Sequence, residues 1–211
     1  MRILNKLKGP SQALLFLMII FACSSMPEIN ITYRIPEKSD DLKGIKVLLV
    51  FKDARRTEDI LGIGAREEYK YFSGNISFSL ARGKEQGFKI GIYDVPVLFM
   101  EGFKRGLENR GVKVVSAKRA GQIELLIVLN EFFLDLIDKK WVVTMEYEAR
   151  LLKEGKVLAK QLINGRAERA KIIGRGQVDT VMGEIFTDMV NKMDLSRLYK
   201  QAGVHGPVTG K

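Results

Sequence analysis

The chain has 211 residues, and its 35 lysines and arginines outnumber 25 aspartates and glutamates, which gives a formal net charge of +10 at pH 7. That length suits one domain with a sizeable core and is short for two. A single cysteine and a single histidine exclude an internal disulfide, a Cys-x-x-Cys redox site and a zinc site built from these residues. The basic balance fits nucleic acid, anionic lipid or an anionic polymer as partner, or a plain soluble surface on which bases and acids are mixed.

The N-terminal segment has the pattern of a secretory signal peptide. Arg2, Lys6 and Lys8 precede an uncharged apolar run of ten residues at 13–22. This run is too short to span a bilayer, which takes roughly 20 apolar residues. A buried core helix of the same length would carry polar positions every three or four residues, and this run has none. The pattern therefore predicts an export signal at residues 1–22.

The end of this signal is more specific than its middle. Ile20-Phe21-Ala22-Cys23 resembles the bacterial lipobox, with Phe21 larger than the usual residue at its position. The resemblance implies that Cys23 is lipidated and becomes the first residue of the mature chain, held by two or more acyl chains. Ser24 follows, which by the same resemblance favours the outer membrane over inner-membrane retention. The alternative is a lone buried cysteine inside a signal that is cut elsewhere. Because the chain is expected to be exported, we expect no nucleic acid as partner, which leaves envelope lipids and polymers.

The first part of the mature chain is expected to be a tether at residues 23–43, followed by a single domain at 44–200 and a disordered tail at 201–211. Alternating apolar residues at 29–35 allow the second half of the tether to pair as an edge strand. The apolar run 45–51 predicts a strand buried on both faces. A long irregular stretch at 55–93 contains a predicted hairpin at 76–93 with its turn at 82–87.

A helix is predicted from Asp94 to Gly111, with Asp94 as N-cap acceptor, Pro96 in the first turn and Gly111 as the stop. Gly102 and Gly106 lie four residues apart on it, which indicates close packing of the helix against a sheet. A three-stranded antiparallel meander follows at 123–137, 141–152 and 157–167. The last helix, at 178–193, carries a methionine-bearing apolar stripe. We expect this stripe to pack in the core, although such stripes also form adaptable binding surfaces. Residues 195–199 add a short helix.

These elements predict an α+β fold with one mixed, largely antiparallel sheet. Two helices, near 95–110 and 178–193, are expected to cover one face of the sheet. The other face is expected to be solvated and to carry Thr144, Glu146, Glu148 and Arg150, which alternate with apolar residues along one strand.

The domain offers little catalytic chemistry. Gly62-Ile63-Gly64 and Gly174-Arg175-Gly176 fall short of a phosphate-binding loop and are interpreted as turns. Glu146 and Glu148 would lie roughly 7 Å apart on a strand, within the ~6.5–9.5 Å range of an inverting glycosidase. Charged pairs of this kind are common on a solvated sheet. We therefore expect no enzyme activity, no catalytic residue, no cofactor and no metal.

The layout of the chain resembles the YajG-like lipoprotein family over residues 13–200. The resemblance rests on the lipobox, the strands at 31–36 and 47–51, the helix at 96–110 with Arg110-Gly111-Val112-Lys113-Val114 after it, and the final helix. The stretch 55–93 is longer here than in that family. Its members are small bacterial envelope lipoproteins whose biochemical role is unsettled, so no catalytic residue carries over. The layout is also similar to auxiliary lipoproteins of transport systems and to activators of cell-wall synthases.

The predicted function is that of a non-enzymatic lipoprotein on the periplasmic side of the outer membrane that binds or scaffolds an envelope protein, polymer or lipid. The predicted contact surfaces are the sheet face with Thr144, Glu146, Glu148 and Arg150, and the basic stretch 52–93. The alternative is an accessory lipoprotein of a lipid or envelope transport system that binds an amphiphile, for which an apolar groove beside the final helix would be evidence. A hydrolase would need clustered carboxylates in a cleft.

Overall fold

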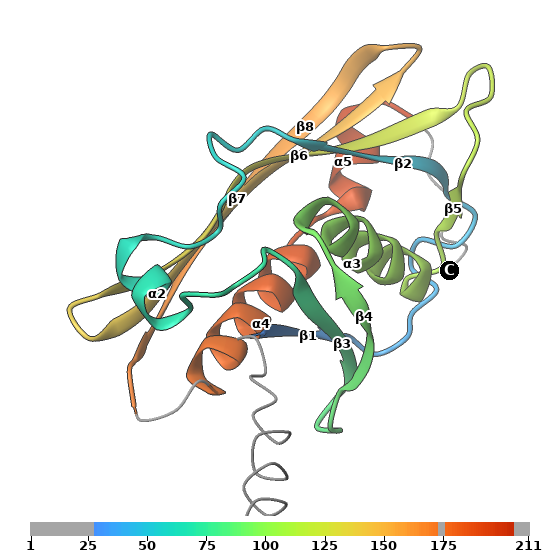
Figure 1. The fold of residues 1–211 in the computed structure, drawn as a ribbon. Helices are drawn as coiled ribbons and strands as arrows, with labels where there is room; N and C mark the ends of the chain where they lie inside the picture. The colour runs from blue at the N-terminus through green and yellow to red at the C-terminus, as the bar shows by residue number, and fades with distance from the viewer. Residues whose placement is uncertain (1–27, 173–175, 205–211) are drawn as a thin grey trace, which may run out of the picture.

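The computed structural model describes residues 28–172 and 176–204, and no helix in these ranges is long and apolar enough to cross a membrane. Residues 1–27, with the predicted signal, lipobox and Cys23, lie outside the described part, as do Gly174, Arg175 and residues 205–211. The chain folds into two sheets and four described helices, an α+β fold as predicted (Figure 1).

The larger sheet has five strands in the order β5-β2-β6-β7-β8, and the smaller has three in the order β1-β3-β4. The large sheet contains β5 (Lys113–Val115), β2 (Lys46–Asp53), β6 (Ile123–Ile137), β7 (Lys140–Lys153) and β8 (Lys156–Ala170). The small sheet contains β1 (Ile29–Ile35), β3 (Ile76–Arg82) and β4 (Phe88–Tyr93). The helices are α2 (Ile63–Glu68), α3 (Val95–Asn109), α4 (Gly176–Asn191) and α5 (Leu195–Gln201).

Both sheets contain parallel and antiparallel neighbours. β2 runs parallel to β5 and β6, whereas β6, β7 and β8 form the predicted antiparallel meander. In the small sheet β1 runs parallel to β3, and β3 and β4 form the predicted hairpin. The helices α3 and α4 lie on one face of the large sheet, and the small sheet packs against them (Figure 1). The single predicted sheet is thus divided in two.

The helix α3 begins and ends where its local signals place it. The Asp94 side chain accepts a hydrogen bond from the backbone N–H of Val97 at 2.9 Å, and Gly111 follows the helix at a φ of +87°. Gly102 and Gly106 permit close packing, but only in part against a sheet. A Cβ on Gly102 would lie 2.6 Å from the ring of Phe186 in α4, and one on Gly106 would lie 2.7 Å from the hydroxyl of Tyr33 in β1.

β1 is part of the core, so the prediction of a tether over residues 23–43 is wrong for this segment. The side chains of Ile29, Ile31 and Tyr33 are fully buried. Their alternation predicted a strand at a sheet edge, and β1 is indeed the edge strand of the small sheet. The predicted tail also starts too early, because Val204 packs against the core.

The helix α4 covers the free edge of β1 with its polar side chains. The backbone N–H of Asn30 donates to the Asp179 carboxylate at 2.9 Å, and that of Arg34 donates to the Thr187 hydroxyl at 3.0 Å. Gly183 allows this approach, since a Cβ there would lie 3.0 Å from a carbonyl oxygen of β1. Unpaired strand edges invite pairing with other chains, and α4 occupies this one.

The predicted core stripe of the last helix is confirmed. The helix α4 ends at Asn191, so Met193 lies just beyond it. The apolar side chains of the stripe are all buried: Val178, Val181, Met182, Ile185, Phe186, Met189, Val190 and Met193. The prediction of two-sided burial for β2 is wrong. Val47 and Leu49 are buried, but Leu48 and Val50 are only half-buried because no described helix covers the opposite face of the large sheet.

Candidate binding surface

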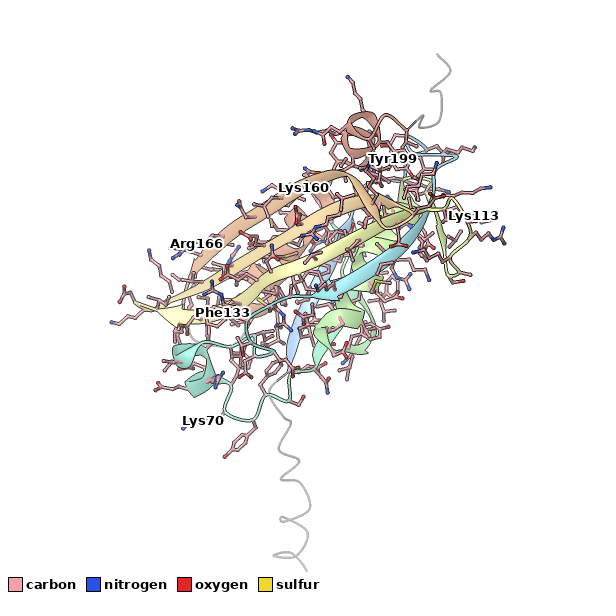
Figure 2. All side chains as sticks on the ribbon, turned by 90° about the horizontal axis from the view of Figure 1, so that it is seen from above. Lys70, Lys113, Phe133, Lys160, Arg166 and Tyr199 are labelled. Carbon is pink, nitrogen blue, oxygen red and sulfur yellow. The ribbon has the colours of Figure 1, made fainter. Side chains whose placement is uncertain are left out.

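The uncovered face of the large sheet, called the outer face below, carries the predicted polar row. On β7 the inward side chains contact the helices: the Tyr147 hydroxyl donates to the Met189 carbonyl oxygen at 2.8 Å, and the Tyr147 ring meets Phe103 edge-on. Thr144, Glu146, Glu148 and Arg150 alternate with these residues and are partly exposed, as predicted. Figure 2 looks onto the outer face, on which Phe133, Lys160 and Arg166 are labelled.

A bulge in β6 shapes the middle of this face. Leu129 pairs with Tyr147 and Glu131 pairs with Glu146, so that Asn130 is one residue more than the partner strand has. Asn130 and Glu131 therefore both belong to the outer face, whereas the flanking Leu129 is buried inside. Bulges of this kind redirect side chains and are frequent beside functional sites.

The neighbouring strand β2 ends at the level of the bulge. Asp53 is its last residue and pairs with Leu129, and the next backbone N–H, of Ala54, donates to the Leu129 carbonyl oxygen at 2.8 Å. The chain then leaves β6 and returns to it at Leu61, which forms a parallel bridge with Leu134. The loop at 54–60 is thus attached to β6 on both sides of the bulge.

An open hollow of about 540 Å³ lies between this loop and the bulge. We call it the bulge hollow. It is lined by Ala54, Arg55, Arg56, Thr57, Asp59, Asn130, Glu131, Phe132, Phe133 and Glu146. The hollow brings together two separately predicted surfaces, the β7 row through Glu146 and the basic stretch through Arg55 and Arg56.

Arg55 holds the loop in place. Its guanidinium binds both carboxylate oxygens of Asp53 and donates to the Glu58 carbonyl oxygen at 3.2 Å. The Arg55 side chain is only 5% exposed, and its charge is compensated within the protein by Asp53. Burial alone would raise the pKa of Asp53, but the hydrogen bonds from the side chain and backbone of Arg55 outweigh it and hold the pKa below its ordinary value.

Two carboxylates of the hollow have hydrogen bonds but no cationic partner. Asn130 donates to the Glu146 carboxylate at 3.1 Å, and the Thr144 hydroxyl donates to the Glu131 carboxylate at 2.8 Å. Glu131 and Glu146 face each other in register, and neither forms an ion pair with any residue that the structure describes. Like charges placed directly opposite on a sheet are unfavourable. A cation between them would therefore relieve repulsion and gain two charged contacts.

Arg56 adds an opposite charge at the rim of the hollow. Its side chain is exposed, and it has no ion pair within residues 28–172 and 176–204. The bulge hollow therefore offers an acidic pair and a basic group to a ligand. The other predicted charges are engaged: Glu148 binds Arg150 and Lys160.

Glu146 and Glu148 are not arranged as the general acid and general base of a glycosidase. Glu146 lines the hollow, whereas Glu148 does not. Burial alone would raise the pKa of Glu148, but hydrogen bonds from Arg150 and then Lys160 outweigh it and lower the pKa. A general acid of a glycosidase needs a raised pKa. No group of three or more potential metal ligands occurs among the described residues.

The turn interpretation of Gly62-Ile63-Gly64 is wrong, because Gly62 is the N-cap of α2 and Gly64 lies within this helix, where both glycines permit close packing. A Cβ on Gly62 would lie 2.2 Å from the carboxylate carbon of Asp135, and one on Gly64 would lie 2.3 Å from the Leu136 carbonyl oxygen. The backbone N–H of Ala65 donates to Asp135 at 3.1 Å. The start of α2 thus binds a carboxylate of β6.

Sequence comparison identifies no relative: no family model matches the chain, and no curated protein matches it significantly. Among solved structures, protein XCC0632 from Xanthomonas campestris, described with the family model DUF330, aligns with a TM-score of 0.54 at 12% identity. The alignment covers 84% of this chain and 96% of that one.

Two further structures are more distant. Lipoprotein GNA1162 from Neisseria meningitidis aligns with a TM-score of 0.28 at 13% identity over 70% of this chain and 99% of that one. A putative neuraminyllactose-binding hemagglutinin homolog from Helicobacter pylori gives 0.33 at 8% identity over 80% and 96%. These two matches are too distant to support an argument. The chain is therefore similar in fold to the Xanthomonas protein, and this similarity carries no activity with it.

Proposed function

We propose that the protein is a bacterial envelope lipoprotein of the YajG-like type that is anchored through Cys23 and binds a partner protein with the outer face of its large sheet. The observation that carries the proposal is the bulge hollow, where Glu131 and Glu146 stand opposite each other without a cationic partner. A lysine or arginine of the partner fits between them. Non-catalytic binding agrees with the low pKa of Glu148.

The composition of the outer face favours a protein over an anionic polymer or lipid. Phe133 lines the hollow, Leu162 is exposed on β8, and Arg56 stands beside the acidic pair. An anionic polymer or membrane would be repelled by Glu131 and Glu146. Protein interfaces combine apolar contacts with charges of both signs.

The alternative of amphiphile binding has less support. It requires an apolar groove beside α4, but the apolar stripe of α4 is buried in the core. The hollow between α4 and β1 is lined chiefly by polar residues, among them Thr32, Asp179, Thr187 and Asn191. The anchor at Cys23, with its lipobox Ile20-Phe21-Ala22, supports a lipid-anchored position, and Ser24 supports the outer membrane facing the periplasm.

Photo-crosslinking in intact cells tests the proposal. A photoreactive amino acid replaces Leu162 on the outer face in the full-length protein, and a matched control replaces Phe88, an exposed apolar residue of the small sheet. We expect a discrete protein adduct from position 162 and none from position 88. Equal adducts from both positions, or lipid adducts alone from position 162, would contradict partner binding by this face.

The acidic pair is tested in the same cells. The double change Glu131→Gln and Glu146→Gln keeps both hydrogen-bond acceptors and removes both charges. Charged hydrogen bonds are worth about 1.5–3 kcal/mol, so the adduct should fall roughly 10- to 100-fold. Glu37→Gln, an exposed change far from the hollow, is the charge control. An unchanged yield from the double variant would assign the binding to other residues.

A further inference from the structure

Large apolar side chains are exposed at one end of the molecule. Ile63 is 84% exposed and Tyr71 75%, and Ile137 and Ile172 are exposed as well. They come from α2, from the loop between α2 and β3, from the end of β6 and from the residues after β8. We call this part, formed by 63–75, 137–139 and 171–172, the apolar end. Single exposed apolar residues are ordinary, but several at one place mark a contact surface.

Direct contacts hold these segments together. The backbone N–H of Lys171 donates to the Lys139 carbonyl oxygen at 2.8 Å, and the Lys171 ammonium binds Glu68 of α2 at 2.6 Å. Gly64 rests against the Leu136 carbonyl oxygen. Figure 1 shows α2, the turn between β6 and β7 and the end of β8 at the same end of the large sheet.

The start of β1 lies toward this same end. Asn30 is bonded to Asp179, in the first turn of α4. Ile172 precedes Gly176, where α4 begins, by four residues, so it lies within about 14 Å of that helix start. The loop with Tyr71 leads into Ile76, which pairs with Ile29.

The anchor is close to the start of β1 along the chain. Cys23 precedes Glu28 by five residues, which span at most about 18 Å even when fully extended. A lipid on Cys23 would therefore hold the first described residue near the bilayer surface. The start of β1, and with it the neighbouring end of the molecule, is then held close to the membrane, and that end carries the exposed apolar side chains.

The opposite end has a different character. Its turn between β7 and β8 exposes Lys153, Glu154 and Lys156, with Val157 as a single exposed apolar residue beside them. Such a turn suits water. At the apolar end, exposed isoleucine and tyrosine side chains can enter the headgroup region, while Lys70 and Lys139 remain at its polar boundary.

We propose that the apolar end contacts the bilayer directly and fixes the orientation of the domain on the membrane, with Ile63, Tyr71, Ile137 and Ile172 entering the lipid headgroup region. This inference rests on the proposed lipid attachment at Cys23. It makes the membrane surface a second, non-covalent partner of the protein.

Fluorescence quenching by lipids tests this orientation. Cys23 is the only cysteine, so once it is lipidated an introduced cysteine can be labelled alone. Ile63→Cys and Ile137→Cys report on the apolar end, and Val157→Cys is the matched control at the opposite end. Each full-length lipidated variant carries an environment-sensitive fluorophore and is placed in vesicles of phosphatidylethanolamine and phosphatidylglycerol that contain nitroxide-labelled lipid.

We expect several-fold stronger quenching and a blue-shifted emission at positions 63 and 137 relative to position 157. Equal quenching at the three positions, with the protein still floating with the vesicles, would overturn the orientation and leave the anchor intact. Failure of the protein to float with vesicles would instead overturn the anchor, and the orientation with it. Cys23→Ala, which lacks the acyl chains, provides the unanchored reference for flotation.

Discussion

Replacing Asp179 tests whether α4 closes the free edge of β1. The Asp179 carboxylate accepts the backbone N–H of Asn30 at 2.9 Å. Asp179→Ala removes this acceptor and leaves the half-buried N–H without it, at a cost of about 1–3 kcal/mol in the free energy of unfolding. Asp179→Asn keeps an oxygen acceptor in the same place, so it should be clearly more stable than the alanine variant.

The pH dependence of the asparagine variant follows from the titration of Asp179. Burial raises its pKa above the ordinary 3.8; the Asn30 hydrogen bond partly opposes this, and the Glu28 carboxylate adds to it. With a raised folded-state pKa, the carboxylate is a burden to the folded state at neutral pH. This burden disappears as the pH falls through that pKa toward 3.8. The free energy of unfolding of the wild type should therefore rise relative to that of Asp179→Asn as the pH falls. The positive end of the helix dipole offsets part of this burden. The two free energies of unfolding should therefore differ by no more than about 1 kcal/mol at pH 7.

Urea unfolding followed by circular dichroism at several pH values measures all three proteins. Equal midpoints for the alanine and asparagine variants would refute the edge closure by Asp179. A gap between wild type and asparagine that widens against wild type at lower pH would refute the sign of the pKa shift. If the alanine variant is too unstable to purify, thermal melting in a cell extract can test the edge closure by Asp179. The comparison of wild type with the asparagine variant still tests the sign of the pKa shift.

Three further variants probe the core and the outer face. Gly102→Ala should lower stability, since overpacking costs about 1–3 kcal/mol against up to ~1 kcal/mol of helix propensity. The loss should be smaller in a Phe186→Leu background, and thermal melting that shows no loss would contradict the tight contact. Tyr147→Phe removes the hydrogen bond to the Met189 carbonyl oxygen and should cost about 1–3 kcal/mol in urea unfolding, so an unchanged midpoint would speak against it. Glu148→Gln should destabilise the protein at pH 7 in the same assay, and the loss should vanish as the pH falls from 4.5 through the lowered folded-state pKa; a loss that persists there would exclude an ionic origin.

The parts of the fold that local signals determine could be predicted from the sequence. Asp94, Pro96 and Gly111 set both ends of α3 without help from distant residues. The strict alternation on β7 likewise assigned Tyr147 to the core and Glu146 to the solvated face. These features depend only on helix capping and on the two-residue period of a strand.

The pairing of strands could not be predicted in the same way. β1 pairs in parallel with β3, and Ile29 lies opposite Ile76, far along the chain. Alternation reveals that one face of β1 is apolar, but it does not say which strand is its neighbour. The division into two sheets therefore depends on contacts that no local pattern encodes.

The candidate site was predicted only in part. Thr144 and Glu146 belong to the bulge hollow or bond to its lining, whereas Glu148 and Arg150 pair with each other elsewhere on the face. Glu131 was missed because a regular strand would have placed Asn130 and Glu131 on opposite faces. The two successive polar residues Asn130 and Glu131 between apolar neighbours were the available signal of a bulge.

The covering of the β1 edge by α4 also has a consequence for folding during synthesis, because β1 is made long before α4. The two bonded partners of the β1 edge lie 149 and 153 residues further along the chain. β1 is therefore completed by a segment that is synthesised about 150 residues later. Until that segment arrives, β1 presents an open edge to every neighbouring polypeptide. A chaperone or a delay in folding would protect the nascent protein during this interval, and truncation before Gly176 would leave the edge open permanently.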